Sequence, residues 1–470
     1  MAKKNGLSRR LFLKNAASAA LGTIALPTII PSSVMGKDGA IAPSNRITLG
    51  AIGVGSMGTN DLQGFLTKPE VRVLGVCDVD SKHRDNARDI VNQTHGDCAS
   101  YGDFRELLAR KDIDAVMITV PDHWHAIIAV AAAQVGKDIY GQKPLAYTIA
   151  EGRAICNAVK QYGVVWQTGS QQRSDKTFRR ICELVRNGRV GKVHTIHVGF
   201  PPKNTINIDF AMCRQVAGLA ENLTLQEMTQ PCPVPKELDY EMWLGPAPWA
   251  PYSPGRCHFN FRWISDYSSG QITDWAGHHC DIAQWAMGTE NTSPVEIEGS
   301  GIFPQATDGL YDTVEDYRFA CKYAEGFTMI VSGNGEFPNS KDGIEFTKCY
   351  LERMGVLFEG TDGWIHVNRG GARSNPPSIL ESPIGTNEIH LYKSDDHKQN
   401  FLDCIKTRRP TIAGVEAAHR SIMLGHLGVI AIKLGRKLHW DPVKERFIND
   451  NEANRLLWRP MRGPWSLDEI

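Results

Sequence analysis

The 470-residue chain lacks an excess of charge of either sign, because its 52 lysines and arginines equal its 52 aspartates and glutamates. It therefore has no basic surplus that would hold a nucleic acid. It also lacks any C-x-x-C pair, and its 11 cysteines are odd in number and scattered from Cys77 to Cys404. This pattern argues against a disulfide framework and against a cysteine-based zinc site. We expect mostly buried thiols and no metal.

The chain also lacks a strongly apolar run long enough for a permanent membrane span. Its candidate, the stretch up to about Ile30, is broken by Gly22 and Pro27. The residues before it read Ser8-Arg9-Arg10-Leu11-Phe12-Leu13-Lys14, which resembles a twin-arginine export signal. An ordinary Sec signal that happens to carry two arginines is the alternative. We predict that residues 1–36 are a signal peptide and that the protein is periplasmic or otherwise exported.

Short apolar runs alternate with helical patterns from Ile47 onward. We predict strands at residues 47–52, 71–77, 115–120 and 138–140, with a helix at residues 125–136. Strands separated by helices in this way form βαβ units and a parallel sheet. The sequence therefore predicts an α/β Rossmann domain over residues 47–168, and the 42% hydrophobic content is sufficient for a large core.

The pattern changes after residue 168. We expect a helix at residues 177–187, a strand at 193–200 and a long irregular stretch from 201 to about 254. Further strands are predicted, separated by glycine-containing turns, at residues 295–302, 316–323, 327–332, 344–350, 356–359 and 364–367. A closing helix places Leu424, Leu427, Ala431 and Leu434 on one face. These elements predict a second, α+β domain with an open, mostly antiparallel sheet over residues 169–441, for substrate binding and oligomerisation, and an extension over residues 442–470.

A glycine-rich motif stands directly between the first predicted strand and the helix that follows it. In its G-x-G-x-x-G pattern the first glycine permits the turn, the second lets a pyrophosphate approach, and the third lets helix meet strand. Asp78 ends the second strand, where a carboxylate accepts hydrogen bonds from ribose hydroxyls and repels a 2′-phosphate, although it could instead cap a helix. We predict a site for NAD, with NADP disfavoured, formed by Gly53, Gly55, Ser56, Met57, Gly58 and Asp78.

Two further motifs make a family resemblance specific. Pro121-Asp122-His123-Trp124-His125 follows the third predicted strand, and Gly141-Gln142-Lys143-Pro144-Leu145 follows the fourth. With these motifs the chain, from Ile47 to about Asp441, resembles the glucose-fructose oxidoreductase, inositol dehydrogenase and rhizopine-catabolism (Gfo/Idh/MocA) family. The family's E-K-P motif falls on Gln142-Lys143-Pro144, so the lysine is present and a glutamine stands in place of the acid. Its D-x-x-x-H-x-x-D pattern falls on residues 274–281.

The resemblance implies NAD(P)-dependent oxidation or reduction of secondary alcohols of sugars and cyclitols, while a minority of members are glycosidases that use NAD without net turnover. It implies that Pro121 and His125 lie near the nicotinamide, although both could simply end a strand and start a helix. Lys143 stands at the carboxyl edge of a strand, where its ammonium can contact both cofactor and reacting oxygen. A solvated surface lysine is the alternative.

Asp274, His278 and Asp281 recur at i, i+4 and i+7, so on one regular helix they would share a face. A histidine accepts a proton near neutral pH, and a neighbouring carboxylate can orient it. We predict Lys143, Asp274 and His278 as catalytic and Arg262 and Asp281 as substrate contacts, against the alternative of a satisfied polar cluster. The side chains of Trp263, Asp266 and Tyr267 suit either a sugar-binding pocket or a purely structural role in the core.

The leading hypothesis is an exported, homo-oligomeric NAD-dependent oxidoreductase that acts on a small-molecule carbohydrate or cyclitol. A redox-neutral glycosidase on the same fold is the first alternative, and a non-catalytic carbohydrate-binding protein is the second.

Overall fold

The computed structural model describes residues 45–201, 224–304, 310–333, 340–345 and 354–467. The chain divides into two compact units, residues 1–46 and residues 47–470, and every element below belongs to the second. The predicted signal peptide lies outside the described residues. Within the described part, no helix is long and apolar enough to cross a membrane. The nine described cysteines are all free, and eight of them are buried, as the scattered pattern predicts.

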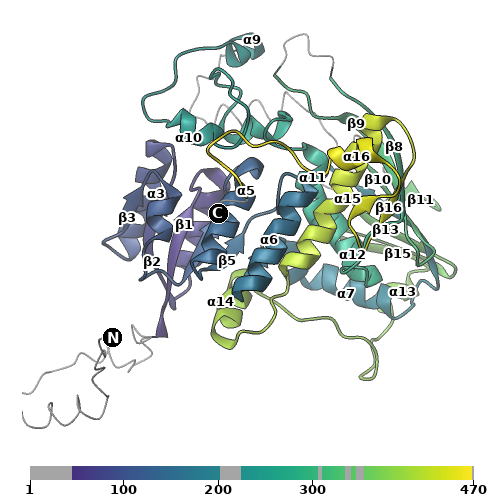
Figure 1. Cartoon of the computed structure of the whole chain (residues 1–470). Coiled ribbons are helices and arrows are strands. Elements are labelled where there is room, and N and C mark those ends of the chain that lie inside the picture. Colours follow the sequence, from purple (N-terminus) through teal and green to yellow (C-terminus); the bar gives the residue numbers. More distant parts are fainter. Residues whose placement is uncertain (1–44, 202–223, 305–309, 334–339, 346–353, 468–470) are drawn as a thin grey trace, which may run out of the picture. The chain divides into compact units, whose positions relative to one another are not determined.

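The first half of the second unit is a six-stranded parallel sheet in the order β3-β2-β1-β4-β5-β6. Its strands are β1 Ile47–Ile52, β2 Val71–Cys77, β3 Ala99–Tyr101, β4 Ala115–Ile118, β5 Asp138–Gly141 and β6 Trp166–Thr168. Its helices are α2 Ser56–Leu66, α3 Ser81–Thr94, α4 Phe104–Leu108, α5 Asp122–Gln134 and α6 Ile149–Tyr162. All four residues of β4 are buried, because helices cover both faces of such a sheet (Figure 1). The predicted Rossmann fold is confirmed.

The second half is built on a nine-stranded sheet in the order β15-β14-β13-β7-β10-β9-β8-β16-β17. Among its described strands, β7 and β10 pair in parallel and the other neighbours pair antiparallel. The strands are β7 Val193–Gly199, β8 Glu296–Ile302, β9 Glu315–Lys322, β10 Thr328–Ser332, β13 Gly355–Gly360, β14 Gly363–Asn368, β15 Gly371–Asn375, β16 Leu438–Asp441 and β17 Arg446–Phe447. The mostly antiparallel sheet is confirmed. Of the strand predicted at 344–350, β12 Ile344–Glu345 pairs with β11 Ser340–Lys341, and the rest lies outside the described residues.

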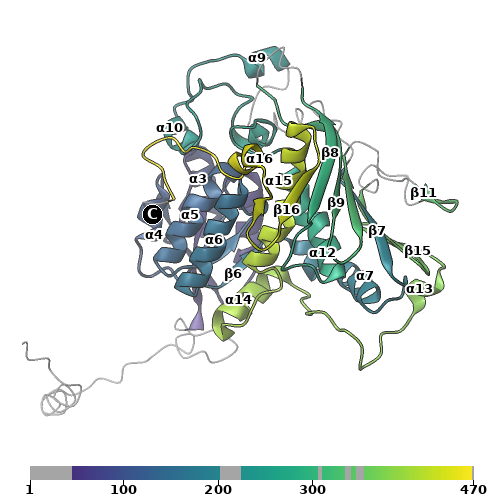
Figure 2. The same cartoon turned by 45° about the vertical axis from the view of Figure 1, so that its right-hand side comes forward.

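Helix α15, Val415–Leu434, joins the two halves. It packs against α6 on one side and against β8 and β9 on the other, as both views show (Figures 1 and 2). Leu424, Leu427 and Ala431 of its predicted apolar face are fully buried. At Gly428 a Cβ atom would lie 2.8 Å from the Phe319 ring, so the absence of a side chain lets the helix approach the sheet closely. Further helices that follow β6 in the chain are α7 Lys176–Arg186, α11 Gln271–Trp275, α12 Asp281–Met287, α13 Ser378–Glu381, α14 His397–Thr407 and α16 Asn451–Arg455. Of these, α14 packs into the core of the Rossmann half.

The described end of the irregular stretch returns to the Rossmann half. It contains α9 Leu225–Thr229 and α10 Tyr240–Leu244, and it is followed by the 3₁₀ helix η3 His258–Trp263. The amide of Ser81 donates to the Glu237 carbonyl over 2.8 Å, and the amide of Asp239 donates to the Val79 carbonyl over 3.0 Å. This segment is therefore fixed beside the carboxyl end of β2.

Candidate active site

The glycine-rich loop between β1 and α2 has no space for side chains at its first and third glycines. Gly53 has a φ of 77°, and a Cβ atom there would lie 2.4 Å from the Thr119 carbonyl oxygen. A Cβ atom at Gly58 would lie 2.0 Å from the Gly53 carbonyl oxygen. At Gly55 the nearest atom would be 3.5 Å away, on the His83 ring. Gly53 thus permits the turn, Gly55 leaves room for a pyrophosphate to approach, and Gly58 lets the helix pack tightly on the strand, as the motif predicts.

The start of α2 is free to receive an anion. Gly55 is the N-cap and supplies no side-chain hydrogen bond, and the first turn holds no acidic residue. The first N–H groups and the positive end of the helix dipole therefore remain available to a pyrophosphate. On the same wall, the buried Thr119 hydroxyl has no hydrogen-bond partner among the described residues. These residues fit a dinucleotide.

Asp78 lies at the carboxyl end of β2, beside the loop. Its carboxylate accepts hydrogen bonds from the amide of Val54 over 2.8 Å and from the amide of Asp80 over 2.9 Å. Burial raises the pKa of Asp78, opposed by His83 and by these amides. The carboxylate therefore holds the loop in shape and stands where the ribose of a bound dinucleotide would be recognised.

One groove collects most of the predicted site residues. Its walls include the glycine-rich loop, Asp78, Pro121, Lys143 and Arg262, and Trp243 and His258 from the irregular segment complete it. Residues from both halves of the unit thus meet at the carboxyl edge of the parallel sheet, the edge where open α/β sheets bind ligands.

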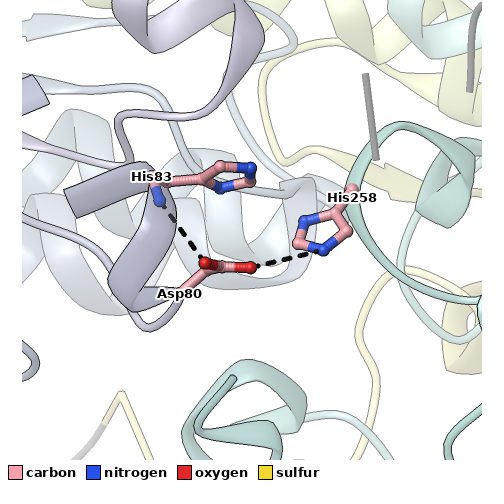
Figure 3. A group of neighbouring side chains, drawn as sticks. All are labelled: Asp80, His83 and His258. Carbon is pink, nitrogen blue, oxygen red and sulfur yellow. Dashed lines mark hydrogen bonds and ion pairs between the residues drawn. The ribbon is translucent and has the colours of Figure 1, made fainter. Parts of the chain in front are cut away.

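His258 reaches from η3 to two residues of the Rossmann half (Figure 3). Its Nε2 lies 3.6 Å from Asp80 Oδ2, and its ring centroid lies 4.9 Å from that of His83. One ligating atom from each of the three residues lies within 4.8 Å of the others, and such donors suit Zn²⁺. However, Asp80 also caps α3 through the amides of Lys82 and His83. All three side chains also line the dinucleotide groove. We therefore assign this cluster to the wall of the groove, and the expectation of no metal stays a prediction.

Lys143, which lines the groove, forms an ion pair with Asp274. The Nζ atom lies 2.6 Å from Asp274 Oδ1, and Arg262 Nε lies 3.7 Å from the same oxygen. Burial alone would raise the pKa of Asp274, but Lys143 and Arg262 outweigh it and lower the pKa. The carboxylate is therefore ionised at neutral pH and holds the lysine ammonium in place. The sequence predicts these three residues as site residues, and the structure brings them together.

His278 does not pair with Asp274 as the i, i+4 spacing implies. Residues Ala276–Cys280 form a π-helical turn between α11 and α12, which shifts the register that a regular helix would have. The His278 side chain is buried, and its Nδ1 has no hydrogen-bond partner among the described residues. Burial, with Lys143, Arg369 and His279 nearby, lowers the pKa of His278 well below its usual value. The ring is therefore neutral and is buried near Lys143.

Asp281 points away from the groove. Its two oxygens bind Arg173 at 2.6 and 2.7 Å, and the Ser421 hydroxyl donates to it over 2.8 Å. Both partners of the ion pair are almost fully buried, at 3% and 2% exposure. The predicted substrate contact of Asp281 does not fit this placement, because the register shift at the π-helical turn leaves the carboxylate inside the core.

His125 also lies behind the groove. Its Nε2 is 2.8 Å from the Val120 carbonyl oxygen and its Nδ1 is 3.3 Å from the Leu145 carbonyl oxygen. It thereby connects the loops that follow β4 and β5 and positions Pro121 and Lys143, without forming part of the groove wall. Tyr267 is fully buried against His123 and Trp243, which favours the scaffold interpretation of that residue.

Asp122 is a groove residue that sequence reasoning did not identify. It follows Pro121, is 3% exposed and accepts a hydrogen bond from the Ser268 hydroxyl over 2.7 Å. Burial raises the pKa of Asp122 to about 7, although Ser268, Arg262 and Lys143 oppose the rise. Its place directly after a strand at the carboxyl edge of the sheet is the signal that could have identified it.

Comparisons with known proteins assign both halves to one oxidoreductase family. Residues 47–170 match the oxidoreductase family described as an NAD-binding Rossmann fold, and residues 220–467 match the C-terminal alpha/beta domain of that family. The myo-inositol 2-dehydrogenase of Thermotoga maritima is 26% identical over 186 residues, which are 36% of this chain and 54% of that protein. A glycosyl hydrolase family 109 protein of Shewanella baltica is 34% identical over 163 residues, which are 31% of this chain and 36% of that protein. The chain thus spans about half or less of the length of these relatives.

The fold also matches solved structures. The WlbA dehydrogenase of Bordetella pertussis, determined in complex with NADH and UDP-GlcNAcA, superposes with a TM-score of 0.58 at 14% identity. The match covers 84% of this chain and 99% of that one.

Proposed function

The chain belongs to the Gfo/Idh/MocA oxidoreductase family, and from this premise we propose that it is an NAD-dependent oxidoreductase of a secondary alcohol in a sugar, glycoside or cyclitol. One observation carries the proposal: the glycine-rich loop and Asp78 share a single groove with Lys143 and Arg262. A dinucleotide held by the loop and Asp78 would share that groove with the Lys143 ammonium, which can contact the reacting oxygen. The inositol dehydrogenase relative supports this substrate class.

When bound, the dinucleotide supplies an acceptor for the hydride of the alcohol carbon. Lys143 holds the alcohol oxygen and stabilises the negative charge that develops on it. Asp274 fixes the ammonium through the 2.6 Å ion pair, and Arg262 supports the same carboxylate. Deeper in the protein, His278 keeps its ring neutral in a buried position next to this pair.

A redox-neutral glycosidase is the second candidate, favoured by the 34% identity to the family 109 glycosyl hydrolase. The two functions differ in their products. We would incubate NAD-loaded protein with a panel of sugars, glycosides and cyclitols, and follow NADH absorbance and released sugar together. Net NADH supports the dehydrogenase, whereas cleaved glycoside without NADH supports the glycosidase. If neither product forms with any member of the panel, the proposed substrate class is wrong.

The preference for NAD over NADP is a testable part of the proposal. The Asp78 carboxylate should repel a 2′-phosphate, so we expect NAD to bind at least about tenfold more tightly, or roughly 1.4 kcal/mol. In Asp78→Ala the two affinities should converge, while Asp89→Ala, an exposed change on helix α3, should leave the ratio unchanged. Titration of protein fluorescence with each dinucleotide gives both constants. Tighter binding of NADP to the unchanged protein would contradict the assignment of Asp78.

We also propose that the protein is exported and assembles as a homo-oligomer. Export is supported by Arg9 and Arg10 and by the need to load a cofactor in the cytoplasm. Changing both arginines to lysine should leave the precursor in the cytoplasm, measured by fractionation and immunoblotting, whereas Lys3→Arg and Lys4→Arg should not. If the double lysine variant is still exported, the protein does not use the twin-arginine route. Light scattering of the purified protein would test oligomerisation.

A further inference from the structure

Asp122 lies between two cavities. One is the dinucleotide groove, whose wall it shares with Lys143 and Arg262. Its oxygen Oδ2 accepts the 2.7 Å hydrogen bond from the Ser268 hydroxyl, and Ser268 lines a second cavity. Both residues are buried, with exposures of 3% for Asp122 and 0% for Ser268. The Asp122–Ser268 hydrogen bond therefore joins a residue that lines one cavity to a residue that lines the other.

The second cavity is rich in hydroxyl groups and opens to solvent. Thr148, Ser269 and Thr313 line it together with Ser268. Trp458 and Phe303, also in its lining, are 58% and 38% exposed, so the cavity reaches the surface there. A hydroxyl-lined passage of this kind carries protons through hydrogen-bonded groups, because each hydroxyl both donates and accepts.

The proposed reaction can use such a passage. Oxidation of an alcohol breaks an O–H bond and releases a proton in a groove whose lining includes Trp243 and His258. The charged groups that face Asp122 are Lys143 after β5, Arg262 on η3 and Asp274 on α11, two positive and one negative. Asp274 stays ionised in its ion pair, whereas the pKa of Asp122 is raised by burial to about 7. Two carboxyls with pKa values held apart in this way commonly divide the work between charge and proton transfer.

We propose that Asp122 and Ser268 carry the reaction's proton between the groove and the second cavity, an inference that rests on the proposed oxidoreductase function. In oxidation the substrate O–H bond breaks and its proton passes to the Asp122 carboxylate. The carbon-bound hydrogen leaves with its electron pair as hydride to the dinucleotide, and a carbonyl forms. Asp122 then gives its proton to Ser268 Oγ as the Ser268 hydroxyl proton passes to solvent in the second cavity. Reduction runs the same route in reverse. The route does not require His278.

The first test needs no substrate. Difference infrared spectra between the NAD-loaded protein and Asp122→Asn isolate the Asp122 carboxyl band, whose titration should have a midpoint near pH 7. In Ser268→Ala the midpoint should move upward, because the lost hydrogen bond favours the carboxylate form. Ser268→Thr should restore it, and Ser378→Ala, an exposed change on α13, is the matched control. A carboxyl already ionised below pH 5, or a midpoint unmoved in Ser268→Ala, overturns the relay whatever the protein's substrate is.

The second test uses a substrate that the unchanged protein oxidises. Because the carboxylate form accepts the proton, the oxidation rate should rise with pH through an inflection near 7 and level off above it. Asp122→Asn should lose this inflection and about 10² to 10⁴ in turnover, with the affinity for NAD kept. Ser268→Ala should have a lower oxidation rate and a larger solvent deuterium isotope effect than the unchanged protein, and Ser268→Thr should recover the oxidation rate. Wild-type rates and pH profiles in both Asp122→Asn and Ser268→Ala would overturn the relay. His278→Ala tests a different hypothesis, in which His278 is the base that accepts the substrate proton. Failure of every substrate would count against the proposed function and leave the infrared result to decide the relay.

Discussion

Lys143→Ala should lower turnover by about 10² to 10³ while the affinity for NAD changes far less. The ammonium is fixed 2.6 Å from Asp274, and Lys143 lines the groove. Because its contact with the alcohol oxygen strengthens as negative charge develops there, its loss raises the barrier more than it weakens substrate binding. Steady-state kinetics and NAD titration on the same preparations measure the two effects separately.

Lys82→Ala is the matched control for this change. Lys82 belongs to the Rossmann half and pairs with Glu237, but its side chain is 74% exposed, outside the groove. It should retain wild-type turnover. A Lys143→Ala protein with unchanged turnover would show that the lysine of the Gln142-Lys143-Pro144 motif does not contact the reacting oxygen.

Arg173→Met should lower the free energy of unfolding by about 3–5 kcal/mol, the cost of leaving one member of a buried ion pair without its partner. Arg173 binds both oxygens of Asp281 and also Glu290, at 2.6 Å, and its side chain is 3% exposed. Its loss leaves the Asp281 carboxylate buried with Ser421 as the remaining described hydrogen-bond partner. Urea unfolding followed by fluorescence measures the change.

The double variant Arg173→Met/Asp281→Leu should recover much of this loss, because apolar groups of similar size can replace a buried pair. Asp395→Ala breaks the exposed pair with Lys393, in which both side chains are 65% exposed, and should leave the transition in place. If Arg173→Met unfolds like the unchanged protein, the Arg173–Asp281 pair does not support the core. If Arg173→Met instead loses affinity for the substrate and keeps its free energy of unfolding, Asp281 contacts the substrate, as the sequence predicts.

The Rossmann half was predictable because its signals are local. The bounds of β1 and β2 agree with the predicted strands, since both are short, mostly apolar runs that end at a glycine-rich turn and at Asp78. The short strands β3 and β6 were not predicted, because three residues carry too little pattern. In the second half, β16 lies at the end of the predicted second domain and β17 comes from the predicted C-terminal extension. Together they form one edge of the nine-stranded sheet, and neither was predicted because their pairing depends on distant strands.

The site was predictable where a motif fixes the backbone and unpredictable where the register changes. Gly53, Gly58 and Asp78 lie where the strand-loop-helix pattern requires them. Asp274 lies 2.6 Å from Lys143, a contact that the sequence did not predict. The π-helical turn at Ala276–Cys280 separates the expected Asp274–His278–Asp281 face, and spacing alone does not reveal such a turn. Asp122 and Ser268 were missed because they are 146 positions apart in the sequence and meet only in the fold.

The central claim is that a carbohydrate carbon gives its hydride to a dinucleotide in this groove, and isotope transfer tests it most directly. We would mix NAD-loaded protein with sugars, glycosides and inositols deuterated at carbon, quench rapidly and weigh the bound dinucleotide by mass spectrometry. The account predicts that at least one of these compounds transfers deuterium to the nicotinamide, whether or not NADH is later released, and that Lys143→Ala slows the transfer. A dinucleotide that stays bound and acquires no deuterium from any member of the panel would contradict it.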